Sequence, residues 1–284
     1  MATFTNQATL SYNGGSTNSN IITGEIIEVL TVSKTAVVDT YRTPDKITYV
    51  VNLINSGNTA LTGLTLTDDL GAYTAGGGTV YPLTYTPDSI RYYTNGTLAA
   101  APAVGTAAPL TITGISVPAG GNASIIYETT TNGFTPRGNE DSVINTVTAT
   151  GAGLANPVTA TETVSPVAAP DLSITKSVSP SVVAENGQLT YTFLIENYGN
   201  TEAGAGDSIV ITDTFNPILT GITVTYNGKA LASPAGYTYD ETTGRFATVA
   251  GQITVPAATF TQDTATGAIS TTPGTATVTV TGTI

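Results

Sequence analysis

The chain of 284 residues contains no cysteine and no histidine. Without cysteine no disulfide bond can form, so any covalent reinforcement has to come from other chemistry. The two absences also remove the usual nucleophile, general base and zinc ligands. Ser-Lys and two-carboxylate hydrolases need neither residue, but no motif for them is present. We therefore expect a protein that is not an enzyme and that uses no cofactor and no metal.

Charge is also scarce, since only 10% of the residues are charged and only 8 of these are basic. The formal net charge of −12 and the scattered basic residues argue against a nucleic-acid partner. No hydrophobic run is long enough to cross a bilayer, so no membrane span is expected. The first residues do not begin a signal peptide, so a signal was removed or the protein reaches its destination without one.

Threonine, valine, alanine and glycine are plentiful, and apolar residues make up 40% of the chain. Apolar and polar residues alternate in short segments that are bounded by glycine, proline and asparagine turns, and no window shows a helical stripe. Residues with β-branched side chains suit a pleated sheet. The sequence therefore predicts an all-β protein, long enough for two domains that each bury a core.

The chain repeats one pattern twice, and the Pro-containing stretch 166–170 separates the copies. Short strands with turn signals at this spacing predict two tandem Ig-like β-sandwiches, in residues 26–165 and 166–284. Residues 1–25 precede them. The repeated positions, first copy and then second, are Lys34 and Lys176, Asn58 and Asn200, and Asp68 and Asp213.

Three polar side chains of the first copy share the parity of the apolar residues around them. Side chains alternate faces along a strand, which places Lys34, Asp68 and Asn145 toward the interior and the neighbouring Asp69 outward. A lone buried charge is costly, so these groups should meet one another. The alternative is that Lys34 and Lys176 extend from strand ends and pair with nearby carboxylates.

A buried lysine beside an aspartate and an asparagine can do more than form hydrogen bonds. Burial disfavours charge, which favours a neutral amine beside a neutral acid. The amine is then a nucleophile, and the acid can polarise the amide carbonyl. Attack with loss of ammonia yields a Lys–Asn isopeptide bond, which contact between the groups makes feasible.

The order and spacing of these motifs resemble the Ig-like conserved-repeat domain of bacterial and archaeal surface proteins, from about residue 26 onward. The buried trio also resembles the self-crosslinking domains of pilins and collagen adhesins. By that resemblance Lys34 is the nucleophile, Asn145 the electrophile and Asp68 the catalytic acid. The family implies a stalk, adhesin or appendage at the cell surface, and it implies no particular ligand.

The second copy has no asparagine at the position of Asn145, and its end can be aligned in two ways. Matched to the last strand of the first copy, residues 277–282 parallel 146–151. Matched to the penultimate strand, residues 273–278 parallel 120–125, and the sequence ends before a closing strand. We prefer the second alignment, because a glycine turn followed by alternation begins that penultimate strand.

The N-terminal residues resemble the closing strand that the second copy lacks. Residues 4–12 alternate like the closing strand 143–150, with Asn6 in the place of that strand's asparagine. Such a segment can complete an open sheet as a donor strand. Asn6 would then join Lys176, with Asp213 as the acid. The donor side chains on the inward face would be Phe4, Ala8, Leu10 and Tyr12.

Residues 13–24 are rich in glycine, serine, threonine and asparagine, which predicts a flexible tether. A tether of this length spans at most about 40 Å, which favours exchange between subunits over closure within one chain. The alternatives for residues 1–15 are a disordered tail and an extra strand of the first domain.

Together these features predict a structural subunit of an extracellular fibre or pilus on a cell or spore surface. It would be a homopolymer, joined head to tail by donor strands and reinforced by isopeptide bonds. The alternative is a non-polymerising adhesin or stalk whose surface binds carbohydrate or protein. The acidic pair Glu140 and Asp141 is expected to face water rather than to bind Ca²⁺. The tyrosines that an adhesin site would use are Tyr92, Tyr93, Tyr237 and Tyr239.

Overall fold

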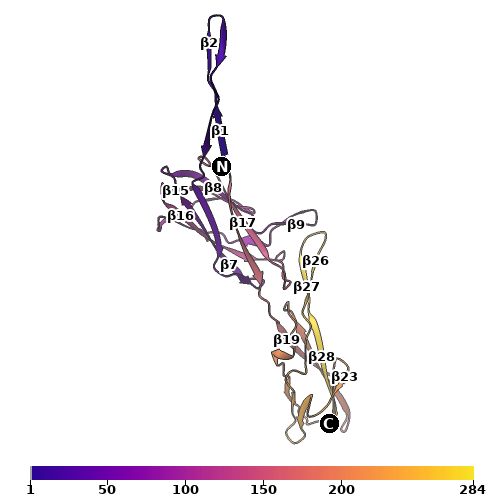
Figure 1. Ribbon diagram of the computed structural model, residues 1–284. Coiled ribbons are helices and arrows are strands. Elements are labelled where there is room, and N and C mark those ends of the chain that lie inside the picture. Colours follow the sequence, from indigo (N-terminus) through magenta and orange to yellow (C-terminus); the bar gives the residue numbers. More distant parts are fainter. Residues whose placement is uncertain (1) are drawn as a thin grey trace. The chain divides into compact units, whose positions relative to one another are not determined.

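The computed structural model describes residues 2–284. Within this range the regular structure consists of strands and one short 3-10 helix, Ala205–Asp207, so the prediction of an all-β fold is confirmed (Figure 1). The chain forms two compact units. The first runs to Pro136 and includes Ser142–Ser165 and Thr264–Gly267, and the second comprises Arg137–Asp141, Pro166–Asp263 and Ala268–Ile284.

The first unit is a sandwich of two six-stranded sheets. One sheet has the order β13-β12-β16-β7-β5, with β11 also paired to β16, and the other has the order β14-β15-β8-β17-β18-β6. A short hairpin of β9 (Tyr73–Ala75) and β10 (Gly78–Val80) accompanies them. The bounds of the sheet strands are β5 (Leu30–Ala36), β6 (Thr40–Tyr41), β7 (Lys46–Asn55), β8 (Leu61–Asp68), β11 (Leu83–Tyr85), β12 (Arg91–Thr94), β13 (Thr97–Ala99), β14 (Ala103–Ala107), β15 (Leu110–Val117), β16 (Asn122–Thr131), β17 (Val143–Thr150) and β18 (Val158–Pro166).

The core of the first unit lies between these sheets. Every second residue of the central strands is buried, as in β7, where Ile47, Tyr49, Val51 and Leu53 are all inaccessible to solvent. The strands β16 and β17 follow the same rule, and β8 and β15 follow it on either side of an irregularity in their pairing. This alternation is what a strand with one face on a core requires.

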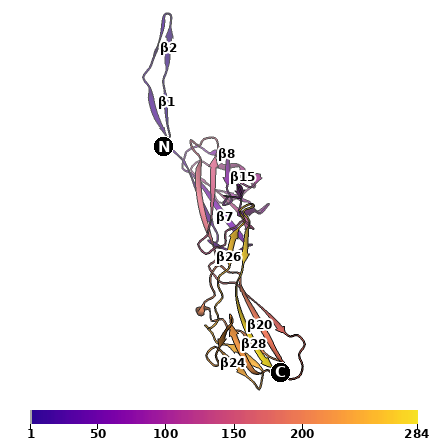
Figure 2. The ribbon, with the colours of Figure 1, turned by 90° about the vertical axis from the view of Figure 1, so that its right-hand side faces the viewer.

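The second unit has one complete and one smaller sheet around its own core (Figure 2). The five-stranded sheet has the order β19-β20-β28-β22-β23, and the three-stranded sheet has the order β21-β25-β24. A separate hairpin joins β26 and β27. The bounds are β19 (Leu172–Ser179), β20 (Gln188–Asn197), β21 (Thr212–Thr214), β22 (Thr220–Tyr226), β23 (Lys229–Leu231), β24 (Tyr237–Asp240), β25 (Arg245–Thr248), β26 (Thr259–Gln262), β27 (Ile269–Thr272) and β28 (Gly274–Thr283).

The last strand of the second unit occupies the place of the penultimate strand of the first. β28 lies between β20 and β22 as β16 lies between β7 and β12. The register also agrees, because Ala276 is opposite Ile195 where Ala123 is opposite Leu53. The strand order and register therefore match the second of the two alignments.

The N-terminal residues form a long antiparallel ribbon, which differs from the predicted strand and tether. β1 (Ala2–Asn6) pairs with β4 (Ile22–Ile26), and β2 (Thr9–Tyr12) pairs with β3 (Gly15–Asn18). Residues 13–24 are therefore mostly paired strand rather than a tether. The reason is the Asn13-Gly14 turn, a preferred two-residue hairpin sequence in which Gly14 has a φ of 114°. The tether prediction gave composition more weight than this turn.

Candidate crosslinking sites and the open sheet edge

Lys34 and Asp68 form a buried ion pair between the two sheets of the first unit. Lys34 lies on β5 and Asp68 ends β8, and their Nζ and Oδ2 atoms are 2.6 Å apart. The Tyr127 hydroxyl donates to the same carboxylate oxygen, and the Leu70 backbone N–H donates to the other one. The carboxylate is therefore fixed by three donors from different parts of the sandwich.

The surroundings of this pair disfavour charge on the amine. The Lys34 Nζ atom lies 4.7 Å from the centre of the Tyr49 ring. Burial lowers the pKa of Lys34, although the charge of Asp68 acts in the opposite direction. Burial and the Asp68 charge raise the pKa of Tyr127, so its hydroxyl stays protonated and can donate. The neutral, nucleophilic form of the amine is therefore more populated in Lys34 than in a lysine exposed to water.

Asn145 completes the inner surface of the same region. On β17, Val147 is directly opposite Asp68, so Asn145 is a diagonal neighbour of Asp68 on the same face. β17 also contacts β5 across the core. Among the described residues, neither the amide nitrogen nor the amide oxygen of Asn145 has a hydrogen-bond partner, although the residue is fully buried. An unpaired buried amide costs about 1–3 kcal/mol, and within the described range the Tyr49 hydroxyl beside it is also unpaired, which makes Asn145 a candidate for a role other than stability.

The sequence interpretation missed the two tyrosines of this cluster. Tyr127 donates to Asp68, and Tyr49 lies beside both Lys34 and Asn145. Their inward parity on β16 and β7 was a usable signal, since a hydroxyl on an apolar face needs a partner or a function. Asp69 instead accepts hydrogen bonds from the backbone N–H groups of Gly71 and Thr146 and so joins the ends of β8 and β17.

The second unit repeats the ion pair in an open form. Lys176 of β19 contacts Asp213 of β21, and the lysine Nζ lies 4.3 Å from the centre of the Tyr191 ring. The two side chains are 39% and 19% exposed, respectively, whereas those of Lys34 and Asp68 are 0% and 2% exposed. The pair is therefore present in both units, but only that of the first unit is closed off from water.

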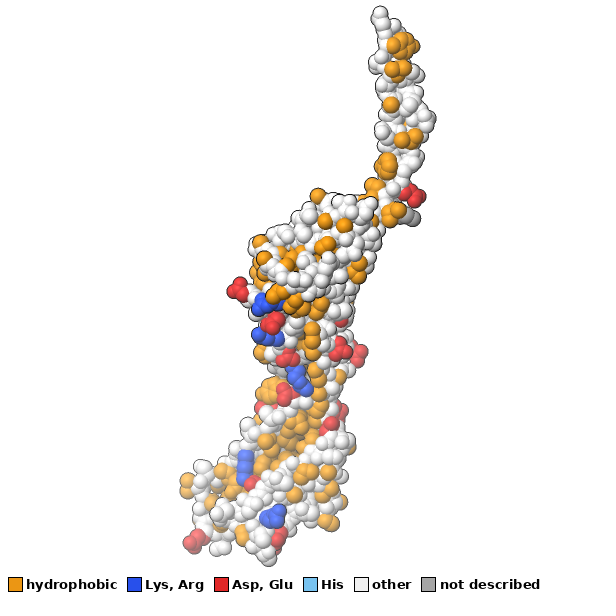
Figure 3. Space-filling view, turned by 90° about the vertical axis from the view of Figure 1, so that its left-hand side faces the viewer, with side chains coloured by type: hydrophobic (Ala, Val, Ile, Leu, Met, Phe, Trp, Pro, Cys, Tyr) orange, Lys and Arg blue, Asp and Glu red, His pale blue; other side chains and the backbone are white. Residues whose placement is uncertain are grey.

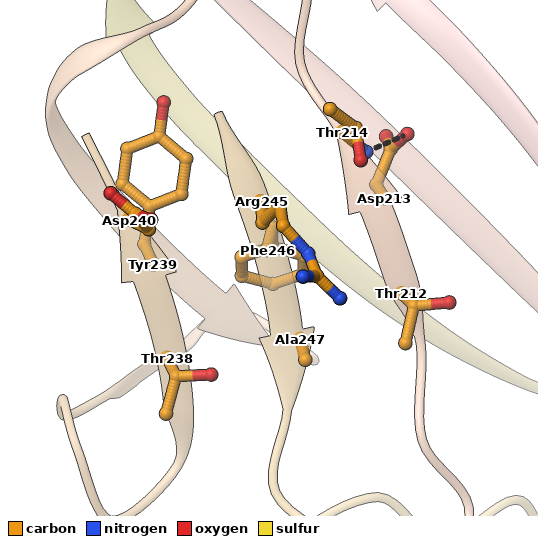
Figure 4. Close-up of a pocket in the computed structure, with 9 residues that line it drawn as sticks. All are labelled: Thr212, Asp213, Thr214, Thr238, Tyr239, Asp240, Arg245, Phe246 and Ala247. Atoms are coloured by element: carbon orange, nitrogen blue, oxygen red, sulfur yellow. Dashed lines mark hydrogen bonds between the residues drawn. The ribbon is translucent and has the colours of Figure 1, made fainter. Parts of the chain in front are cut away.

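The exposure follows from the free edge of β21. Figure 4 shows Thr212, Asp213 and Thr214 on β21 beside β25. In the first unit the corresponding strand β8 lies between β15 and β17, whereas β21 pairs only with β25, and no strand of residues 2–284 pairs with its other edge. A groove of about 360 Å³ opens at this edge. Figure 3 shows hydrophobic side chains exposed on one face of this unit. The lining residues are Ile174, Thr175, Lys176, Phe193, Val210, Ile211, Thr212 and Asp213.

The predicted donor residues lie on the N-terminal ribbon, where they are exposed. Phe4 is 51%, Leu10 65% and Tyr12 63% accessible, and Ala8 is exposed as well. The Phe4 ring covers Gly24, and the Tyr12 ring covers Gly15, both on the returning strands. Each aromatic ring therefore lies on the same face of the ribbon as the glycine opposite it. Asn6 is directly opposite Ile22.

The tyrosines considered for a binding surface do not form one. Tyr92 and Tyr237 are buried, and the Tyr92 hydroxyl donates to the Ser116 carbonyl. The Tyr239 hydroxyl donates to the Leu219 carbonyl. Tyr93 is half-buried. Tyr92, Tyr237 and Tyr239 therefore pack against the cores, and the hydroxyls of Tyr92 and Tyr239 also have backbone partners.

The described range, residues 2–284, offers neither a cluster of metal ligands nor a helix that could span a membrane. No group of three or more His, Cys, Asp or Glu side chains there could hold a metal ion. Near Glu140, the Asp141 carboxylate accepts the Gly138 backbone N–H. No helix in the described part of the chain is long and apolar enough to cross a membrane.

No family model matches the chain, and no curated protein matches it. Among solved structures, the chain is similar to BcpA, the major pilin subunit of Bacillus cereus, at 10% identity over 96% of this chain and 73% of that one, with a TM-score of 0.37. It is similar to RrgB, the pilus backbone of Streptococcus pneumoniae, at 13% identity, 86% and 55% coverage and a TM-score of 0.35.

A third similar structure is the collagen adhesin CNA of S. aureus, with 13% identity, 53% coverage of each chain and a TM-score of 0.31. The chain thus spans about half of the RrgB and CNA structures.

Proposed function

We propose that the chain is a structural subunit of an extracellular fibre at a cell or spore surface. In this homopolymer, the N-terminal segment of one subunit completes the open sheet of the second unit of the next subunit. The observation that carries the proposal is the free edge of β21, together with an N-terminal segment that repeats the pattern of β17. The corresponding strand β8 has β17 on that side.

The contact between the N-terminal ribbon of one subunit and the free β21 edge of the next is called the joint below. Each of these two parts has groups that contact with the other would satisfy. A free strand edge presents unpaired N–H and C=O groups, and such edges are where an added strand binds. The groove beside β21 is lined by the buried core residues Phe193 and Ile211 and by the exposed side chains of Ile174 and Val210. A two-stranded ribbon without a core is at best marginally stable in water. Docking of the ribbon on the β21 edge would pair the free backbone groups of that edge and bury apolar surface of both the ribbon and the groove.

The isopeptide bonds would reinforce first the subunit and then the joint. In the first unit, the neutral Lys34 amine attacks the Asn145 side-chain carbonyl carbon, a new C–N bond forms, and the amide nitrogen leaves as ammonia. Asp68 passes protons between the attacking and leaving nitrogens. In the joint, Asn6 takes the place of Asn145 as the electrophile. Lys176 is the nucleophile, as Lys34 is in the first unit, and Asp213 is the acid, as Asp68 is. The donor segment also excludes water from Lys176, as the sandwich does for Lys34.

The test is assembly of the full chain, observed by electron microscopy and by electrophoresis after boiling in detergent. Fibres and a detergent-resistant ladder are expected from the natural sequence. Asn6→Ala and Lys176→Arg should each abolish the ladder, while the control Asn20→Ala on the same ribbon should keep it. Monodisperse monomer from the natural sequence, as a non-polymerising adhesin or stalk would give, would contradict the proposal.

Exchange between subunits can be separated from closure within one chain. A chain lacking residues 2–26 can only accept a donor, and a Lys176→Arg chain can donate but cannot be crosslinked as an acceptor. Mixing the two should give a covalent product whose mass is the sum of both chains less one ammonia. If donation occurs only within a chain, no such product forms.

A further inference from the structure

We infer that the donor is the entire hairpin of residues 2–26, so that one neighbouring subunit supplies two strands, in the places of β17 and β18. This inference rests on the proposed function and specifies its joint. A single donor strand followed by a loose tether would fill only the place of β17. The difference lies in the returning strands β3 and β4, which would enter the joint rather than remain in solvent.

The acceptor sheet is short by two strands, not one. In the first unit β8 is followed by β17, and β17 is followed by β18. Beside β21, the strands of residues 2–284 provide a counterpart for neither. β18 is part of the core of the first unit, since Val164 is fully buried and Val158 and Ala160 pack against the core. A single strand added to β21 would leave this side of the second core uncovered.

The ribbon has the connectivity and length of the missing pair. β17 and β18 form a hairpin in which Asn145 is directly opposite Glu162, and in the ribbon Asn6 is directly opposite Ile22. The chain from Asn6 to Ile22 is one residue shorter than the chain from Asn145 to Glu162. The hairpin therefore has the length of the missing pair, while its register shifts by one residue between β1–β4 and β2–β3, a shift that β17 and β18 do not have.

The ribbon also has one apolar face that spans both of its arms. Directly opposite residues of an antiparallel pair point to the same side, so Ile22 lies on the face of Asn6, and Ile26 lies on that face as well. Both isoleucines are exposed. On the other face, Thr5 is opposite Thr23. A returning arm that served only as a tether would have no need for isoleucines on this face.

The register of the joint follows from that of the first unit. There, Val147 is opposite Asp68 and Ala149 is opposite Leu66. With Asn6 in the place of Asn145, Ala8 would lie opposite Asp213 and Leu10 opposite Ile211. Leu10 would then enter the groove that Ile211 lines.

Three single variants of the full chain test the hairpin: Leu10→Asp on the inward face of the first arm, Ile22→Asp on the inward face of the returning arm, and Thr23→Asp on its outward face. A carboxylate forced into an apolar joint is costly, so the first two should raise the monomer concentration needed for fibre growth by at least about tenfold. Thr23→Asp should leave it within about twofold, and the conservative Ile22→Val should assemble like the natural chain.

The outcomes separate the hairpin from the proposed function. If Leu10→Asp blocks assembly while Ile22→Asp assembles like Thr23→Asp, the hairpin is refuted and the single donor strand stands. If neither inward variant affects assembly, both proposals fail. If Thr23→Asp blocks assembly as strongly as Ile22→Asp, the assignment of the buried face is wrong. Because the ribbon lies outside both cores, unchanged thermal unfolding of the monomers verifies that each variant folds.

Discussion

Single residues in the first unit show a costly arrangement that a bond would relieve. Removing an ammonium and a carboxylate from water can cost more than their mutual attraction returns, so the buried pair of Lys34 and Asp68 is weak evidence for stability. The unpaired amide of Asn145 adds a further cost. When the lysine proton passes to Asp68 and the neutral amine attacks Asn145, ammonia leaves, the amine and the amide become one uncharged isopeptide group, and the Asp68 carboxyl is neutral as well. The three unfavourable features are then explained by one reaction.

The first prediction concerns that bond in the first unit. The intact mass of a chain lacking residues 2–26 should be one ammonia below the mass calculated from its sequence. Asn145→Ala should restore the calculated mass and lower the free energy of unfolding by roughly 2–5 kcal/mol, the cost of losing a native disulfide, which likewise restricts the unfolded chain. Mass spectrometry and urea unfolding measure the two effects. The exposed variant Asn122→Ala should keep the mass deficit, and a deficit that survives in Asn145→Ala would disprove the assignment.

The second prediction concerns alkaline pH. Burial raises the pKa of Tyr49 and, together with the Asp68 charge, that of Tyr127. Both phenols therefore stay protonated in the folded unit, while in the unfolded chain they ionise near pH 10. Their contribution to stability is complete below that pH and is lost as the pH rises above it. Urea midpoints measured from about pH 8 to 12 should fall at the alkaline end, and less steeply in Tyr127→Phe. Equal slopes in the two chains would contradict this.

At the scale of strands and turns, the sequence Asn-x-Gly-Asn-Thr forms a turn at residues 55–59 and again at residues 197–201. The buried side chain of Asn55 lies within hydrogen-bonding distance of the carbonyls of Thr59, Val117 and Pro118, and its oxygen accepts the Gly57 N–H. Asn197 makes the corresponding contacts in the second unit. The first asparagine of the motif therefore ties the turn to a neighbouring strand end.

The third prediction follows from this tie. Asn55→Ala leaves three buried or half-buried carbonyls without their side-chain donor and should lower the free energy of unfolding by about 2–4 kcal/mol. Asn58→Ala, at the exposed asparagine of the same turn, should change it by no more than about 0.5 kcal/mol. Urea unfolding of both variants decides the question. Equal effects would mean that the motif acts only through backbone preference.

The strands also show what a sequence can and cannot reveal. Period-two alternation predicts the strands, and parity puts Lys34, Asp68 and Asn145 on inner faces, because one buried face fixes the side of every second residue. Parity cannot tell which residue of the opposite sheet is met, so the contact between Tyr127 and Asp68 was not foreseen. The ribbon was missed for another reason. Its hydrophobic residues have no core in the isolated chain, so composition alone made residues 13–24 look like a tether.

At the scale of the whole molecule, the two units differ in how completely they are closed. The first has six strands in each sheet, while the second has five and three among residues 2–284. Apolar surface that stays uncovered contributes less to stability than buried apolar surface, and an exposed ion pair contributes at most about 1 kcal/mol. The difference in closure should therefore appear as a difference in stability.

The fourth prediction is that a chain lacking residues 2–26 unfolds in two calorimetric transitions. The second unit should unfold at the lower temperature, because its core is open and it has no internal crosslink. Asn145→Ala in the same chain should lower only the upper transition. In assembled fibres of the natural chain the lower transition should disappear, since the donor covers the groove and is covalently attached. A single unchanged transition in all three samples would contradict the proposed completion of the second unit.

The positions of the two lysines have a mechanical consequence. Lys34 lies on β5, the first strand in sequence of the first sandwich, and Asn145 lies on β17, its penultimate strand, so a bond between them would let tension pass directly from one to the other. The residues between them would then bear none of the pull. In the second unit, a bond from Lys176 on β19 to the next subunit would divert the load before it reached β20. A stretched fibre would transmit force through a small fraction of its backbone, and most of each subunit would remain slack.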